Sequence, residues 1–310
     1  MAAKAKAQSA RAIALSLVRV SITGVSMTAV KSGVKYFPPV SLLTFRFIIA
    51  TFLLWAMNRV VGGAWPNKRT AWARAIIFSV IQVLIPTLLL YLAMPYSSAG
   101  TASIVYATQP LVLALVATRL LGESLTLRRA LGMILGFGGV VFVMYIRIGA
   151  GGKVDTIWGT ILNGIAVISL TAGAIFFKRY PVQASDWSML AIQYAVSSIV
   201  LIPTIFLFGE NPLSGTFNGA VYGSLAYSLI GSSIIGPLIF QVMLAKGEAS
   251  VFMSYYFLTP CLGLLAGTVF LGEGFTPRDS IGLALTAIGI TIIARSPAGV
   301  AAAKPATARR

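Results

Sequence analysis

The sequence predicts an all-α integral membrane protein with ten transmembrane helices, arranged as two inverted repeats of five helices with both termini in the cytoplasm. Three observations predict this fold: the composition, ten apolar stretches and a duplicated block. The chain has 310 residues, of which 57% are hydrophobic and only 10% are charged. Because soluble domains average about 25% charged residues, this chain has too little polar surface to cover a globule in water. The bilayer is therefore its expected solvent.

Ten stretches have the length of about 20 apolar residues that spans a bilayer. Most connections between them contain only a few residues, so neighbouring helices are expected to be antiparallel, and no second soluble domain fits. In chain order the expected spans are 12–30, 40–60, 73–94, 97–120, 127–146, 157–177, 187–208, 220–244, 249–271 and 276–294.

The charge is strongly positive, with 24 Lys and Arg residues against 7 Asp and Glu. In a soluble protein this excess would suggest nucleic acid as a partner, but here the basic residues lie in short gaps between apolar stretches. An even number of spans places both termini on the same side of the membrane, and 17 of the Lys and Arg residues then lie on that side. Only Lys31, Lys35, Arg147, Lys153 and Arg278 fall on the other side. Basic residues accumulate in cytoplasmic loops, so we expect cytoplasmic termini, a cytoplasmic (inner) membrane location and no nucleic-acid partner.

A single cysteine, Cys261, and the absence of histidine limit the available chemistry. They exclude an internal disulfide, a cysteine-based metal site and catalysis by a histidine-dependent triad. The seven acidic residues all fall in loops or near helix ends, so a nucleophile–base pair inside the bilayer is missing as well. We expect no cofactor and no metal, and an enzyme embedded in the membrane is the least favoured function.

A duplicated block establishes the internal repeat. Tyr106–Pro110 followed by Leu121–Arg128 recurs 150 residues later as Tyr256–Pro260 followed by Leu271–Arg278. Both copies contain a Leu-Gly-Glu turn. The first parts of the halves align at an offset near 147, which puts Arg46 opposite Gln193. We therefore expect a first five-helix repeat at 1–148, a second at 149–296 and a disordered cytoplasmic tail at 297–310.

An odd number of helices per repeat means that the second copy enters the membrane from the opposite side. Inverted repeats of this kind are typical of alternating-access transporters, whose binding site lies near the bilayer midplane between the halves. The repeat thus predicts a transporter with a small-molecule substrate and the lipid bilayer as its partners. Glycine-rich stretches in the fifth and tenth spans indicate close helix contacts or a dimer face, and we expect a monomer with a dimer as the alternative.

The proline of each fourth helix, the Leu-Gly-Glu turn and the glycine-rich fifth helix together resemble the EamA-type repeat of the drug/metabolite transporter superfamily. Lys31 and the Phe45-Arg46-Phe47 motif are similar to the first-repeat pattern, whereas Thr23-Gly24 replaces the usual Trp-Gly pair. Within the superfamily the chain most resembles the amino-acid and metabolite exporters of the YddG type. The resemblance implies export of small metabolites through a central cavity.

Arg19 and Arg46 are the charges expected inside the membrane, where each costs about 2.5–3.5 kcal/mol at the helix centre. Either arginine could extend to the headgroups, and Arg46 could instead bind a substrate carboxylate. Tyr106 and Tyr256 each precede a proline by one turn, and a proline frees a backbone carbonyl one turn earlier. The candidate substrate contacts are Tyr106, Gln109, Tyr256, Gln82, Tyr91, Asn163, Ser103 and Arg46.

Two transport hypotheses follow. The first is an exporter of amino acids, apolar or aromatic and broad in specificity, working by uncoupled facilitated diffusion because no carboxylate lies mid-span to bind a coupling ion. The alternative is an organic-phosphate or nucleotide-sugar exchanger, which would need several basic residues near the midplane. For the first hypothesis we expect a mainly apolar and aromatic cavity with few charges, formed by the first, third, fourth, sixth, eighth and ninth helices.

Overall fold

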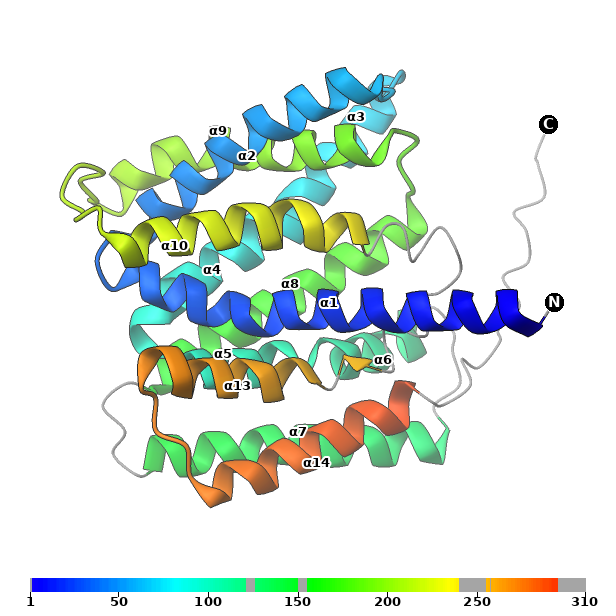
Figure 1. The fold of residues 1–310 in the computed structure, drawn as a ribbon, viewed down its shortest axis with the longest axis vertical. Coiled ribbons are helices and arrows are strands. Elements are labelled where there is room, and N and C mark those ends of the chain that lie inside the picture. The colour runs from blue at the N-terminus through cyan, green and yellow to red at the C-terminus, as the bar shows by residue number, and fades with distance from the viewer. Residues whose placement is uncertain (1, 121–125, 150–154, 240–254, 257, 295–310) are drawn as a thin grey trace.

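The computed structural model describes residues 2–120, 126–149, 155–239, 255–256 and 258–294, and within these residues it contains helices and no β-strand. Figure 1 shows a bundle with α1 near its middle and the α7–α14 pair at one edge. The helices are α1 (Ala2–Val34), α2 (Pro39–Val61), α3 (Arg69–Ser79), η1 (Val80–Leu84), α4 (Ile85–Ala93), η2 (Met94–Tyr96), α5 (Ala99–Tyr106), α6 (Gln109–Leu120), α7 (Leu127–Gly149), α8 (Ile157–Arg179), α9 (Asp186–Leu207), α10 (Gly219–Tyr227), η3 (Ser228–Ile235), α13 (Leu258–Leu271) and α14 (Pro277–Ala294).

Each of the ten expected spans contains helix in the described part of the chain. Seven helical segments among the described residues are long and apolar enough to cross a membrane, and Leu258–Leu271 is apolar but shorter. The fourth span is interrupted where α5 ends at Tyr106 and α6 begins at Gln109, just before Pro110. The count of ten crossings and the cytoplasmic termini stay predictions.

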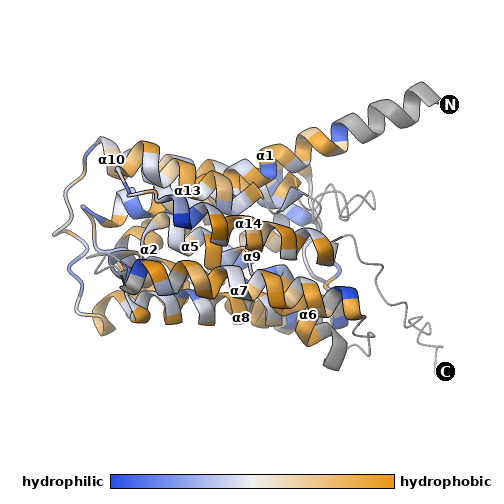
Figure 2. Ribbon diagram, turned by 90° about the horizontal axis from the view of Figure 1, so that it is seen from below, coloured by the Kyte–Doolittle hydropathy of each residue, from blue (hydrophilic) through white to orange (hydrophobic). Residues whose placement is uncertain are grey.

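Large apolar side chains cover the outside of the bundle. Phe206 is 73% exposed and Val141 is 65% exposed, and Figure 2 shows apolar residues along the outer helices α6, α7 and α14. Such exposure would favour aggregation in water, whereas in a bilayer these side chains contact lipid tails. The apolar outer surface therefore fits the bilayer location that the composition predicts.

Several helices in the bundle begin at polar residues whose side chains cap free backbone N–H groups. The side-chain oxygens of Ser98, Thr156, Ser185 and Asn218 accept hydrogen bonds from the backbone at the starts of α5, α8, α9 and α10. Each such cap stabilises a helix by about 1 kcal/mol. At the other terminus of a helix, α2 ends at Gly62, whose φ of 68° favours glycine. The boundaries are thus encoded locally.

Contacts between the halves follow a two-fold relation. Helix α2 packs on its repeat counterpart α9, and α7 packs on its counterpart α14. Helix α1 contacts α10 and α13, while its counterpart α8 contacts α4, α5 and α6. The end of α1 and the start of α8 lie together, because Lys31 donates to the carbonyl of Ser97 and Thr156 donates to that of Tyr96. Helices α1 and α8 therefore run in opposite directions, as an inverted repeat requires.

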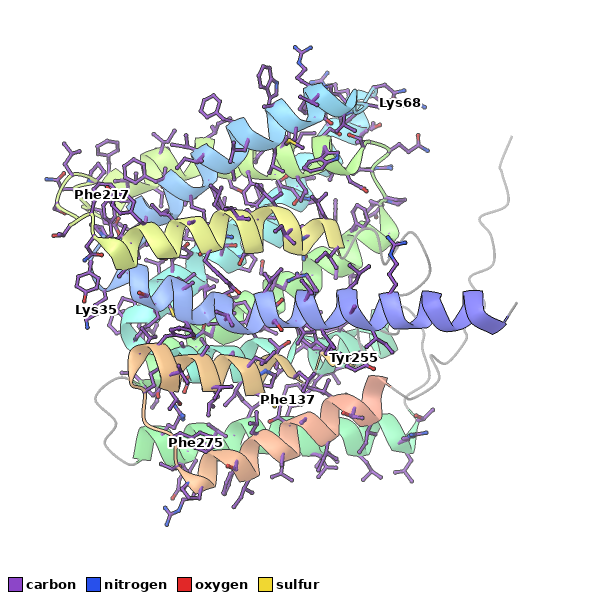
Figure 3. All side chains as sticks on the ribbon, viewed as in Figure 1. Lys35, Lys68, Phe137, Phe217, Tyr255 and Phe275 are labelled. Atoms are coloured by element: carbon purple, nitrogen blue, oxygen red, sulfur yellow. The ribbon has the colours of Figure 1, made fainter. Side chains whose placement is uncertain are left out.

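The bundle has two ends, which Figure 3 marks with labelled lysines. The terminal end is where α1 begins and where Lys68 lies, and the distal end is where α1 stops and where Lys35 lies. Backbone bonding between Ser185 and Ala64 places the α8–α9 connection at the terminal end, beside the α2–α3 connection. These two names are kept below.

Glycines bring α7 and α14 into backbone contact. A Cβ atom on Gly139 would lie 2.6 Å from the carbonyl oxygen of Gly282, and one on Gly289 would collide with the backbone of Gly136. These glycines are thus used for packing inside the chain. Gly138 differs, because a Cβ there would meet nothing within 4 Å.

We expect Gly289→Leu to destabilise the protein by about 1–3 kcal/mol, the usual cost of overpacking a tight contact. Gly138→Leu on the open side of α7 is the matched control and should be neutral or slightly stabilising, since leucine favours a helix over glycine. Thermal unfolding of the purified variants in detergent measures both. Equal midpoints for the two variants would contradict the packing assignment.

Candidate functional site

A cavity of about 550 Å³ lies between the two repeats. Its wall combines residues of α1, α2, the α3–η1–α4 segment and α5 from the first repeat with residues of α8, α9 and the η3 region from the second. Val182, Ala184 and Asp186 extend this wall to the α8–α9 connection. The cavity thus runs from the middle of the bundle towards the terminal end.

Two π-helical segments contribute polar atoms to this cavity. Gln82 lies in η1 and Ser232 lies in η3, 150 residues apart and hence at equivalent positions of the repeat. Each segment is soon followed by a proline, Pro86 or Pro237, and π-helical turns inside α-helices are frequent at functional sites. Gln82 Oε1 and Ser232 Oγ are buried without a hydrogen-bond partner in the described structure. Gln82 Oε1 lies against Gly173 of α8, and both oxygens have hydrogen-bonding capacity that the described structure leaves unused.

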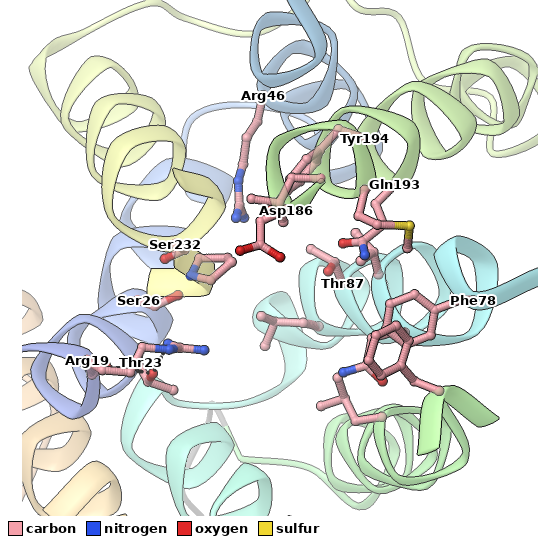
Figure 4. Close-up of a pocket in the computed structure, with 18 of the residues that line it drawn as sticks. Arg19, Thr23, Ser26, Arg46, Phe78, Thr87, Asp186, Gln193, Tyr194 and Ser232 are labelled. Carbon is pink, nitrogen blue, oxygen red and sulfur yellow. Dashed lines mark hydrogen bonds between the residues drawn. The ribbon is translucent and has the colours of Figure 1, made fainter. Parts of the chain in front are cut away.

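Arg46 extends from α2 into the cavity, as Figure 4 shows. Its Nε donates to Ser233 Oγ at 3.0 Å and its Nη1 to Tyr91 Oη at 3.3 Å, and the guanidinium lies 5.5 Å from the ring of Phe47. All three partners are neutral. Although Arg46 is only 5% exposed, no carboxylate among the described residues forms an ion pair with it. The charge is oriented but not neutralised.

Arg19 enters the same cavity from α1, where Figure 4 shows it beside Thr23. Its Nη1 donates to Thr23 Oγ1 on the same helix, and its Nε is buried without a partner in the described structure. Arg19 therefore faces the cavity, and the alternative of an arginine that reaches the headgroups does not apply in this conformation.

The second repeat supplies Asp186, Gln193 and Tyr194 from α9. Asp186 is exposed in the first turn of the helix, where a negative charge is stabilised by the helix dipole. Gln193 was not among the candidate contacts. It is the repeat counterpart of Arg46, so the alignment of the two halves could have identified it from the sequence. Phe78 and Phe177, which contact each other at 4.9 Å between ring centroids, form an aromatic part of the wall.

Three of the eight candidate contacts lie in the cavity wall, namely Tyr106, Gln82 and Arg46. The Tyr106 hydroxyl donates to the carbonyl of Pro86 at 2.9 Å, which joins α5 to α4 across the wall. This bond orients the Tyr106 ring, and its acceptor lies in the first turn of α4.

The other five candidates lie outside the cavity wall in the described structure. Tyr91 accepts the bond from Arg46 and so holds that side chain in place. Ser103 donates to the carbonyls of Ala99 and Gly100 and packs closely against Gly263. Asn163 donates to the carbonyl of Gly159, Tyr256 packs beside Val20, and Gln109 starts α6.

Two expectations require correction. The second and seventh helices, which were not expected to line the cavity, contribute to it through α2 and α9. The charged residues of the wall are Arg19, Arg46 and Asp186. No described residue of the ninth helix lines it. The carbonyl of Tyr256 is not freed by Pro260, because it accepts a hydrogen bond from the N–H of Thr259 at 3.0 Å. The turn before the proline tightens and satisfies that oxygen.

Helix N-termini at the distal end are bound by carboxylates from the second repeat. Glu273 follows Gly272, whose φ is 64°, and accepts from the N–H groups of Ala99 at 2.7 Å and Gly100 at 3.1 Å. Glu210 accepts from the N–H groups of Val40 and Ser41 and from the Ser41 hydroxyl, at 2.8–3.0 Å. The Leu-Gly-Glu turn of the second repeat thus attaches the α13–α14 connection to the start of α5.

Arg147 forms a second group of bonds at the distal end. Its Nε donates to Asp279 at 2.9 Å, and its Nη1 donates to Ser98 at 2.9 Å and lies 3.5 Å from Asp155. Asp155 also accepts from the N–H of Ser98 at 2.7 Å. Lys31 donates hydrogen bonds to the carbonyls of Met94 and Ser97 at the same end. Together these bonds hold the ends of α1, α5, α7, α8 and α14 together. The distal end is closed by a polar network.

A profile of the EamA-like transporter family matches residues 10–145 and again residues 157–295. The chain belongs to the EamA-like transporter family. It is a multi-pass membrane protein built from two family repeats, and membrane transport is its general function.

Two bacterial relatives of the chain are themselves described as transporters. The chain is 26% identical over 272 residues to the uncharacterized transporter YvbV of Bacillus subtilis, covering 87% of each chain. It is 23% identical to the uncharacterized inner membrane transporter YedA of Escherichia coli, covering 88% of this chain and 87% of YedA.

Two further comparisons concern length and fold. A WAT1-related chloroplastic protein of Arabidopsis thaliana is 26% identical, and 87% of this chain covers 66% of that longer protein. A crystal structure with 16% identity matches with a TM-score of 0.66 over 91% of this chain and 96% of its own. The match to this crystal structure shows that the two proteins share a fold.

We expect Asp279→Asn to lower the free energy of unfolding by about 3 kcal/mol, because it leaves the largely buried Arg147 without its nearest charge partner. Arg278→Gln is the control, since Arg278 is the exposed neighbour of Asp279 in the same turn. Unfolding in mixed micelles, followed by tryptophan fluorescence, compares the two variants. A control as unstable as Asp279→Asn would refute the role of this ion pair.

Proposed function

We propose that this EamA-like transporter exports small metabolites, foremost amino acids with apolar or aromatic side chains, across the cytoplasmic membrane. Export proceeds by alternating access through the cavity between the repeats. The observation that carries the proposal is Arg46, a buried arginine aimed into a cavity that also has an aromatic wall. The volume of about 550 Å³ falls in the range of about 300–1,000 Å³ typical of small-molecule sites.

A substrate carboxylate fits Arg46 because the existing partners of this side chain are neutral. Ser233 and Tyr91 fix the Nε and Nη1 edges, so the remaining Nη2 atom can donate to a ligand without rearrangement. A charge-assisted hydrogen bond of this kind contributes about 1.5–3 kcal/mol. The apolar side chain of the substrate would contact Phe78 and Phe177, which offer few directional contacts. Broad specificity for apolar and aromatic side chains follows.

The direction of access follows from the two ends of the bundle. The polar network around Arg147 and Glu273 closes the distal end, and the cavity extends to the terminal end. With the termini in the cytoplasm, as the distribution of basic residues predicts, this conformation receives substrate from the cytoplasm. Monomeric function is supported by Gly136 and Gly139 of α7 and Gly282 and Gly289 of α14, which are occupied by contacts within the chain.

Uncoupled transport is supported by the position of acidic groups. Proton- or sodium-driven carriers use carboxylates buried at membrane depth. Asp186 is the acidic residue among the described residues of the cavity wall. It is exposed at the start of α9 and is therefore not a buried carboxylate of this kind. The substrate gradient alone would then drive export.

An organic-phosphate exchanger is the second candidate, and a specific observation favours it. A phosphate group requires several basic side chains in one place, and both Arg19 and Arg46 line the same cavity. The same charges fit a carboxylate, so the chemistry of the anion must be decided by experiment.

Counterflow in proteoliposomes tests the function. Vesicles loaded with unlabelled phenylalanine or leucine should accumulate the labelled amino acid without any proton gradient, because the outward gradient of unlabelled substrate is sufficient to drive counterflow through an uncoupled carrier. Vesicles loaded with a sugar phosphate serve as the comparison. Accumulation with sugar phosphates alone would favour the second candidate, and dependence on a pH gradient would overturn uncoupled transport.

Arg46→Gln should reduce counterflow by about tenfold or more, since it removes a charge-assisted bond to the substrate. Arg59→Gln is the matched control at the exposed end of the same helix, where Arg59 lies over Trp55. The rate is normalised to the amount of protein inserted in the vesicles. Equal rates for Arg46→Gln and the control would show that Arg46 does not bind the substrate.

A further inference from the structure

The cavity contains a second cation that the assignment of Arg46 leaves unexplained. Arg19 is held by Thr23 on its own helix, and no described residue forms an ion pair with it. Its Nε is buried without a partner in the described structure. A charge inside the membrane usually pairs with another group of the protein or lines a functional pathway. Arg19 lines such a pathway.

The surroundings of Arg19 leave room for its guanidinium at the cavity wall. A Cβ atom on Gly236 would lie 3.2 Å from Arg19 Nη1, so the glycine at the end of η3 lets the side chain pass close to the backbone. Ser232, one turn earlier, has a buried hydroxyl without a partner in the described structure. Figure 4 shows Arg19 and Ser232 on the same side of the cavity. Together they place two polar groups with unused hydrogen-bonding capacity in this part of the wall.

Charge is distributed unevenly between the two repeats. Both cavity arginines belong to the first repeat, and their counterparts in the second repeat, at an offset of about 147, are the uncharged Ala166 and Gln193. The cavity therefore has a cationic side, which is not repeated by the internal symmetry. In Figure 4, Arg19 and Phe78 lie on opposite sides of the cavity.

A substrate ammonium group finds no matching partner at this depth. Among the described lining residues Asp186 is the carboxylate, and it is exposed at the start of α9, while Arg46 is buried and Arg19 is half-buried. Two arginines and one aspartate give the wall a net charge of +1. An ammonium next to Arg19 is repelled, and this repulsion is strong where the dielectric constant is low.

We propose that Arg19 is a specificity-determining residue that selects amphipathic organic monoanions, with a carboxylate and an apolar or aromatic body, over zwitterions of the same shape. The carboxylate binds on the cationic side between Arg46, Arg19 and Ser232, and the apolar body lies against Phe78 and Phe177. Amino acids still enter, but their ammonium group lowers affinity. This inference rests on the proposed function, because it uses the same cavity as the transport site. It changes the preferred substrates within that function from amino acids to monoanions of the same shape.

A matched set of three ligands tests the selection. Phenylpropionate has the carboxylate without the ammonium, phenylalanine has both, and phenylethylamine has the ammonium without the carboxylate. We expect the purified wild-type protein in detergent to bind phenylpropionate about tenfold tighter than phenylalanine, and phenylethylamine more weakly than either. Isothermal titration calorimetry gives the three dissociation constants.

Variants separate charge from structure. Arg19→Gln should reduce the preference for phenylpropionate over phenylalanine to about one. Arg19→Lys keeps the charge and should retain most of the preference, and Arg59→Gln on the exposed end of α2 should leave it unchanged. Thermal unfolding of each variant confirms that it is folded. A preference that survives in folded Arg19→Gln, or its absence in the wild type, would overturn the proposal.

Counterflow with the same three compounds keeps the two proposals distinguishable. Wild-type vesicles that exchange phenylalanine and phenylpropionate equally well support transport through the cavity but overturn selection by Arg19. Binding with the expected preference but without counterflow of any compound overturns the proposed function and leaves the binding assignment standing. Faster exchange of phenylpropionate, lost in Arg19→Gln, supports both.

Discussion

A charge inside a bilayer must be neutralised by the protein or offered to a ligand, and this constraint separates the two charged regions of the molecule. At the distal end Arg147 is bound by Asp279 and Asp155, and Glu273 by the start of α5. In the cavity Arg19 and Arg46 have only neutral partners among the described residues. Since unpaired charges at membrane depth are costly, the first region stabilises the fold, and we propose that the second binds a ligand.

The internal duplication explains the backbone better than it explains the side chains. Equivalent π-helical segments place Gln82 and Ser232 in the cavity, because both depend on how the third and eighth helices pack against the same axis. Arg46 and Gln193 also occupy equivalent positions but carry different charges. A two-fold backbone therefore surrounds a cavity that is electrically one-sided, which suits a substrate with a charged end and an apolar end.

Helix positions were predictable from the sequence because length and hydropathy decide which segments can enter a bilayer. The cavity was predictable only in part. Arg19 lies about two turns inside the first span, and whether such a side chain faces lipid, headgroups or a cavity depends on the rotation of the helix about its axis. Packing partners from distant segments fix that rotation. The same reason separates Tyr106, which lines the cavity, from its duplicate Tyr256, which does not in the described structure.

The polar closure at the distal end also fits a protein that opens and closes. Glu273 and Glu210 bind backbone N–H groups near the bundle surface, where water can replace either partner once the helices separate. Hydrogen bonds exchanged with water have a small net free energy, so opening this end would leave few groups unsatisfied. An apolar closure would instead expose hydrophobic surface at about 25 cal/mol per Å². The polar contacts at the distal end can therefore be exchanged for contacts with water when the helices separate. The glycine contacts between α7 and α14 cannot be exchanged in this way, so this helix pair stays together.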